Sequence, residues 1–262
     1  MSLAQPILVF DIETVTDLQA GRHLYQLELS DEATEAALAK IFRQDKGHDF
    51  PPLVLHNVVC ISGLWIENQE IKLFSWTQEQ YTEKQLLQRF VQIFEHQRPI
   101  LVSWNGSQFD LPVIMQRCLY HGISAAALYD HGEWNRHKRQ DNYQNRYQLR
   151  HTDSMDDLSQ FNLRHIQKLD EIAQFLGFPG KRIAQGYHVA QQVKDAQWDE
   201  MSAHCEGDVL NTWLIYLRWS LLRGFIDEQA HQLWIEHTIA YLKQQPKQQT
   251  YLKKKKKSAQ ST

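Results

Sequence analysis

Two carboxylates, Asp11 and Glu13, stand two residues apart beside an apolar run near the start of the chain. Residues 5–12, Gln-Pro-Ile-Leu-Val-Phe-Asp-Ile, have the pattern of a strand buried on both faces. Side chains two apart on a strand point to the same face, with Cα atoms roughly 7 Å apart. Carboxylates in this arrangement repel each other, and a hard divalent cation removes that repulsion. The alternative is that the strand ends here and both acids meet solvent.

A third acid, Asp110, follows a turn after a second buried strand. Residues 100–104 have the pattern of that strand, an Asn-Gly turn signal comes next, and residues 108–121 predict a helix with Pro112 in its first turn. Open α/β sheets place their chemistry at the carboxyl ends of strands. Asp110 is alternatively a capping or first-turn acid that the helix dipole favours.

The fourth acid, Asp208, belongs to a predicted helix at 199–223 that carries apolar side chains on two sides. Such a helix is buried, and His204 and Asp208 share one of its apolar sides. A buried aspartate is costly unless it is neutral, paired or bound to a metal. The alternative role is therefore a structural hydrogen bond between His204 and Asp208. Glu206 falls outside both apolar stripes and is expected to be exposed.

Composition narrows the class of protein. The apolar fraction of 42% is ordinary for a soluble globular chain, and no run is long enough to span a membrane. Three cysteines are too few for a disulfide framework, and no secretory signal is visible, so the cytoplasm is the expected compartment. Five consecutive lysines at 253–257 leave the remainder of the chain acidic. That balance suits an enzyme that collects cations better than a protein that coats nucleic acid.

Strands alternate with helices along the chain, which predicts an α/β domain. The expected strands are residues 5–12, 53–66, 70–76, 100–104 and 149–152. The expected helices are residues 30–45, 79–97, 108–121, 169–176, 199–223 and 225–242. The link at 67–69 makes a hairpin, so the sheet is mixed. We expect one domain over 1–243, with a helical insertion at 16–52, a C-terminal helix at 225–242 and a disordered basic tail at 244–262.

The four acids are consistent with one metal site. Four carboxylates can hold two Mg²⁺ or Mn²⁺ ions, and two ions about 3.5–4 Å apart can clamp the attacking and leaving oxygens of a phosphodiester.

Three motifs then resemble a known family. Phe10-Asp-Ile-Glu-Thr14, Trp104-Asn-Gly-Ser-Gln-Phe-Asp110 and His204-Cys-Glu-Gly-Asp208 are similar to the three motifs of the DEDD 3′–5′ exonucleases. The branch that the chain resembles is that of bacterial predicted exonucleases related to the proofreading domain of family-B DNA polymerases. The similarity covers roughly residues 6 to 220. It implies a ribonuclease H-like fold, in which a mixed five-stranded sheet is flanked by helices and followed by a helical C-terminal part.

The resemblance also implies roles for individual residues. Asp11, Glu13 and Asp208 would bind the first ion, and Asp11 and Asp110 the second. Asn105 and Phe109 would seat the terminal nucleotides, and Thr14 would lie beside the 3′ end. The substrate would be the 3′ end of single-stranded DNA or RNA, with DNA favoured and nucleoside 5′-monophosphates released.

His204 departs from the family pattern. The polymerase-related branch has Tyr four residues before the last Asp, and the other branch has His one residue further away. An imidazole at this position could orient or deprotonate the attacking water, since its unperturbed pKa is near 6.5. The departure motivates an alternative function, a catalytically weak module that binds nucleic acid or docks a partner. A generic α/β enzyme with incidental acids is a third, remote alternative.

Each of the other candidate substrate contacts also has a purely structural interpretation. Residues 134–150 mix basic and aromatic side chains, which suits phosphates and stacked bases but also a solvated loop. Lys181, next to Gly180, could contact a phosphate or belong to a simple turn. Asp153 could lie near the site or begin a helix. The lysine tail could add affinity that falls with salt, or only solubility.

Overall fold

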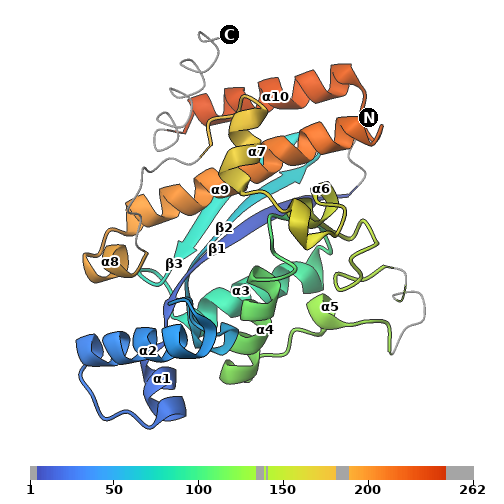
Figure 1. Cartoon of the computed structure of the whole chain (residues 1–262). Helices are drawn as coiled ribbons and strands as arrows, with labels where there is room; N and C mark the ends of the chain where they lie inside the picture. Colours follow the sequence, from blue (N-terminus) through green and yellow to red (C-terminus); the bar gives the residue numbers. More distant parts are fainter. Residues whose placement is uncertain (1–4, 134–138, 140, 181–188, 246–262) are drawn as a thin grey trace.

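A five-stranded mixed sheet forms the centre of the protein (Figure 1). The structure is a computed structural model that describes residues 5–133, 139, 141–180 and 189–245. The strands are β1 (Ile7–Thr16), β2 (His56–Glu67), β3 (Glu70–Thr77), β4 (Ile100–Ser103) and β5 (His151–Asp153). Their order is β3-β2-β1-β4-β5; β2 is antiparallel to β1 and β3, whereas β4 and β5 run parallel to β1. The mixed five-stranded, ribonuclease H-like arrangement is therefore confirmed.

Helices cover both faces of this sheet (Figure 1). One face packs against α3 (Glu83–His96), α4 (Asp110–His121) and α5 (Ala126–Tyr129). The other packs against α7 (Leu169–Phe175), α9 (Trp198–Leu222) and α10 (Glu228–Lys243). Alternate residues of β1 enter the two cores, Ile7 and Val9 on the α9 side and Leu8 and Phe10 on the α3 side. The unbroken apolar run of β1 follows from this burial on both faces.

The remaining helices lie at the edges. α1 (Leu18–Tyr25) and α2 (Asp31–Lys46) form the expected helical excursion between β1 and β2, and a 3₁₀ turn, η1 (Leu53–Leu55), returns the chain to β2. The other short elements are α6 (Ser154–Leu158), η3 (Leu163–His165) and α8 (Val189–Lys194). No helix in the described part of the chain combines the length and apolar character that crossing a membrane requires. Residues 246–262 of the predicted disordered tail lie outside the described residues, and so does Lys181.

Strand β1 is longer than its apolar run predicts, because it continues to Thr16 beside β2. The pairing slips between Glu13 and Thr14, where β2 carries one extra residue. β4 accompanies β1 only as far as Val9. The acids of β1 therefore lie where the strand has lost its β4 neighbour, at the edge of an opening in the sheet.

Candidate active site

The four predicted acids and His204 line one cavity of about 630 Å³. Asp11 and Glu13 come from β1, Asp110 from the first residue of α4, and His204 and Asp208 from α9. Three stretches that are far apart in the sequence thus meet at the point where β1 passes the end of β4. Their meeting is a property of the fold; their catalytic roles stay a prediction.

The turn before α4 places Asp110 against β1. Its Oδ1 accepts a hydrogen bond from the backbone N–H of Ile12 at 3.2 Å, in a position where β4 no longer pairs with β1. Gly106 permits the tight turn, because a Cβ there would lie 2.4 Å from Ser103 Oγ. Asn105 has a left-handed φ of 65°, which asparagine tolerates better than most residues. Asp110 is therefore held against β1 by a backbone hydrogen bond, at the end of a turn that Asn105 and Gly106 allow.

Asp153 fixes the same turn from β5. Its Oδ1 accepts from the N–H groups of Asn105 at 2.9 Å and Met155 at 3.1 Å, and its Oδ2 accepts from Ser107 N–H at 2.8 Å. Both interpretations of Asp153 are thus correct, since it caps α6 and also supports the loop that carries Asp110. Asp153 acts on the site by positioning this loop.

Burial and like charges act together on the acids. Burial of the carboxyl group, followed by the charges of Asp110, Asp208 and Glu13, raises the pKa of Asp11 well above its ordinary value. Burial also raises the pKa of Asp110 to about 7, and the charge of Asp153 adds to this shift, although hydrogen bonds from two backbone N–H groups, its own and that of Ile12, oppose it. A cation bound in the cavity would therefore be favoured, because it would offset the repulsion between these carboxylates.

Helix α9 contributes more than Asp208. His204 is buried, and its Nε2 lies 3.8 Å from Asp208 Oδ2, which is an ion-pair distance if the ring is protonated but longer than a hydrogen bond. The thiol of Cys205 donates to the Asp11 carbonyl and to Oδ2, both at 3.4 Å. One ligand atom from each of Asp11, Glu13 and Cys205 lies within 4.8 Å of the other two. Nothing in the sequence pattern singles out Cys205 as a member of this group.

The expectation that Glu206 is exposed is wrong. Its side chain is buried, and its Oε1 accepts a hydrogen bond from Ser75 Oγ at 2.7 Å. The reason is that α9 crosses β1, β2 and β3, so the polar side of this helix turn faces the edge strand β3.

Residues 166–170 also line the cavity that holds the four acids, although no motif in the sequence marks them.

The predicted substrate contacts have different positions. Asn105 and Phe109 line the cavity beside the acids. The hydroxyl of Thr14 forms a hydrogen bond with His56 Nδ1 at 2.8 Å. Lys181 falls outside the described residues, so its proposed phosphate contact stays a prediction.

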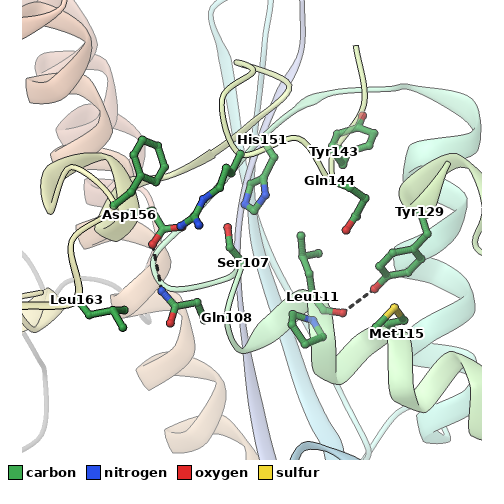
Figure 2. Close-up of a pocket in the computed structure, with 13 residues that line it drawn as sticks. Ser107, Gln108, Leu111, Met115, Tyr129, Tyr143, Gln144, His151, Asp156 and Leu163 are labelled. Atoms are coloured by element: carbon green, nitrogen blue, oxygen red, sulfur yellow. Dashed lines mark hydrogen bonds and ion pairs between the residues drawn. The ribbon is translucent and has the colours of Figure 1, made fainter. Parts of the chain in front are cut away.

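Residues 134–138 and 140 of the basic and aromatic stretch lie outside the described residues, and the rest of the stretch divides into core and surface. Tyr143 is buried and donates to Pro99 O at 2.7 Å, and Arg150 binds Asp141, so both serve the structure. Arg146 binds the buried Asp156 at 2.7 Å and is 45% exposed. Together with Ser107 and Gln108 it lines a second cavity of about 520 Å³. Figure 2 shows this cavity, with Gln108 bonded to Asp156.

Comparison with known proteins identifies the family. A family model described as "Predicted 3'-5' exonuclease related to the exonuclease domain of PolB" matches residues 48–258. The chain belongs to this family, and it is therefore a nuclease. The match includes the motifs of Asp110 and Asp208, whereas Asp11 and Glu13 lie before it. A comparison with curated protein sequences finds no match.

Two solved structures are among those to which the chain is weakly similar. A family B DNA polymerase from the hyperthermophilic archaeon Pyrobaculum calidifontis matches 81% of this chain and 25% of its own chain, with 16% identity and a TM-score of 0.49. The ExoI/SSB-Ct complex matches 85% of this chain and 46% of its own, with 12% identity and a TM-score of 0.32. The chain spans about a quarter and about half of these two chains, and the likenesses are too weak to transfer any residue's role.

Proposed function

We propose that the protein removes nucleoside 5′-monophosphates from the 3′ end of single-stranded nucleic acid, with DNA favoured, at a site that holds two Mg²⁺ or Mn²⁺ ions. Membership of the exonuclease family supports the direction of digestion. The observation that carries the proposal is the meeting of Asp11, Glu13, Asp110 and Asp208 around one cavity.

The chemistry of the donor set fits hard divalent ions. Four carboxylates offer only oxygen ligands, and their mutual repulsion contributes to the raised pKa of Asp11. A pair of bound ions would polarise the phosphate and stabilise the charge that develops on the attacking and leaving oxygens. Asp11, Glu13 and Asp208 would hold one ion, and Asp11 and Asp110 the other.

The other residues of the cavity have supporting roles in this proposal. His204 would orient the attacking water or accept its proton from its place beside Asp208. Phe109 and Asn105 would hold the last nucleotides against the acids, and the loop that carries them is anchored by Asp153. Asp110 would then stay aligned while the strand advances by one nucleotide per cycle.

The test is a time course on single strands of DNA and RNA that carry an internal label and a free 3′ end. With Mg²⁺ or Mn²⁺ we expect stepwise shortening and mononucleotide release, faster for DNA, and none with excess chelator. A strand blocked by a 3′-terminal phosphorothioate should shorten more slowly. An intact strand across metals and pH values would refute catalysis.

A second candidate is a weakly catalytic module that binds nucleic acid on the same fold. Its motivation is His204, whose ring lies 3.8 Å from Asp208 where the related branch has Tyr. This candidate predicts that the wild type binds a fluorescent strand without shortening it. A gain of digestion in His204→Tyr would favour it, whereas a further loss from an active wild type would favour the exonuclease.

A further inference from the structure

Three aromatic rings form a continuous surface beside the proposed active site. We call Phe50, His56 and Phe109 the aromatic step. The ring centroids of Phe50 and His56 are 4.9 Å apart, those of His56 and Phe109 are 5.0 Å apart, and those of Phe50 and Phe109 are 5.7 Å apart. Phe109 also lines the cavity that holds the four acids. The step therefore begins inside the proposed site and ends at Phe50, which comes from the helical excursion between β1 and β2.

The ring of Phe50, at the outer end of the step, is exposed to solvent although it is large and apolar. Phe50 is 53% exposed, whereas His56 beneath it is buried. An isolated exposed apolar side chain needs no explanation. An exposed aromatic ring that continues a row of rings into a catalytic cavity does call for one.

Hydrogen bonds hold His56 and the backbone of Phe50. His56 Nδ1 is bonded to the Thr14 hydroxyl at 2.8 Å, and His56 Nε2 lies 3.2 Å from the carbonyl of Pro51. The backbone N–H of Phe50 donates to His48 Nδ1 at 3.2 Å. Pro51 and Pro52, which follow Phe50, restrict the backbone further. A rigid ring loses little entropy when a flat ligand stacks on it.

We propose that the aromatic step stacks unpaired nucleobases upstream of the terminal nucleotide, and that Phe50 supplies its outer stacking surface. This inference rests on the proposed function, and it adds a binding surface for the unpaired bases that precede the terminal nucleotide. Aromatic side chains stack on every kind of base, because each base has a π face. The faces of bases inside a duplex are already covered by their neighbours, so a paired end cannot use the step until it frays.

The first test compares Phe50→Ala, Phe50→Trp and a matched control, Leu24→Ala, which removes another exposed apolar side chain from the same excursion. For Phe50→Ala we expect KM on single strands to rise on the order of 10-fold, with a smaller change in kcat. Phe50→Trp should keep or lower KM, and Leu24→Ala should match the wild type. Equal KM values for Phe50→Ala and Leu24→Ala would overturn the proposal.

The second test removes the base instead of the ring. Strands with one abasic nucleotide at each of the first six positions from the 3′ end are given to the wild type and to Phe50→Ala. Stacking predicts one or two positions where the abasic change weakens the wild type and the effect of Phe50→Ala disappears. A Phe50→Ala defect that is the same on every strand would mean that Phe50 only supports the structure, and would overturn the proposal.

The same strands separate this inference from the proposed function. Binding is measured by fluorescence anisotropy alongside digestion. If the wild type binds but digests nothing, the proposed function fails, and the abasic pattern in binding still decides whether Phe50 stacks. If the wild type digests and no abasic position interacts with Phe50, the stacking proposal alone fails.

Discussion

Two groups of acids lie close to β1 and differ in the charges that compensate them. Glu83 and Asp17 surround Arg117, whose side chain is 2% exposed. Arg117 donates to both oxygens of Glu83 at 2.7 and 2.5 Å and pairs with Asp17 at 2.8 Å. The second group, Asp11, Glu13, Asp110 and Asp208, surrounds the cavity.

Neighbouring carboxylates raise the pKa in both groups, which favours the charged form of Arg117 but disfavours the charged form of Asp11. Burial alone would lower the pKa of Arg117, but the hydrogen bond and charge of Glu83 and the charge of Asp17 raise it overall. In the cavity, the charges that act on Asp11 belong to three carboxylates, and each raises the pKa of Asp11 further. The fold thus supplies its own cation, Arg117 of α4, between Glu83 of α3 and Asp17 at the start of α1. At the cavity it gathers acids that repel one another, which is the arrangement expected where the cation comes from solution.

Removing one acid of the cavity should give the largest effect on activity. Asp11→Asn keeps the size of the side chain but removes the carboxylate that both ions would share. We expect kcat/KM on single-stranded DNA to fall by roughly 10³-fold or more, which corresponds to several kcal/mol of transition-state stabilisation. Digestion of a labelled strand with Mg²⁺ or Mn²⁺ measures the change. The exposed Glu200→Gln on α9 is the matched control, and a fully active Asp11→Asn would remove Asp11 from the site.

Removing the internal cation should instead act on stability. Arg117→Met removes the guanidinium that Glu83 and Asp17 share. Glu83 keeps its contacts with His121 Nε2 at 2.6 Å and Val58 N–H at 2.8 Å, but loss of the buried cation should cost about 3–5 kcal/mol of unfolding free energy. Urea unfolding measures this loss, and adding Glu83→Gln to the variant should restore part of it. Arg43→Met breaks an exposed ion pair with Asp49 and should unfold at almost the wild-type midpoint. A similar midpoint for Arg117→Met would mean that the two acid groups do not differ as argued.

Local sequence patterns predicted the strands of the sheet and singled out the four acids. Each acid lies at a strand end or on a helix face, and the spacing of apolar residues indicates both. The length of β1 was not predictable in the same way. Its last residues, Glu13 to Thr16, are held by pairing with β2 rather than by an apolar pattern of their own. The position of Glu206 also depends on a partner, Ser75, 131 residues away.

The long-range interactions near the site could not be predicted from the sequence, for the same physical reason. Nothing near Arg117 in the sequence indicates that it meets Glu83, 34 positions earlier. Asp153 reaches Asn105 across a separation of 48 residues, through the parallel pairing of β4 and β5. Phe50 precedes two prolines in a segment that is predicted only as the end of an excursion. Such pairings are set by the packing of complete elements, which a single sequence does not display.

Divalent ions should bind the acids of the cavity and not the acids around Arg117. An ion that binds the folded cavity adds about 2.7 kcal/mol of unfolding free energy at one hundred times its dissociation constant. Thermal unfolding with Mn²⁺ and then with excess chelator should show a reversible rise in Tm for the wild type. Arg117→Met should keep this response, and Asp208→Asn should lose most of it. A rise of equal size in Asp208→Asn would indicate ions bound elsewhere.

The smallest predicted effect concerns Asp110 in the protein without ions. Burial raises the pKa of this acid to about 7, above its ordinary value near 4. Between these two pH values the folded chain holds a proton that the unfolded chain has released, so the unfolding free energy falls as pH rises from about 4 to about 7. Asp110→Asn keeps an oxygen acceptor for the Ile12 N–H but cannot ionise, so it should lose this slope and be more stable than the wild type at pH 8. Urea unfolding at pH 5 and pH 8 with chelator measures both quantities. An unchanged slope in Asp110→Asn would show that Asp110 is already compensated without an added cation, and the contrast with the acids around Arg117 would no longer hold at this residue.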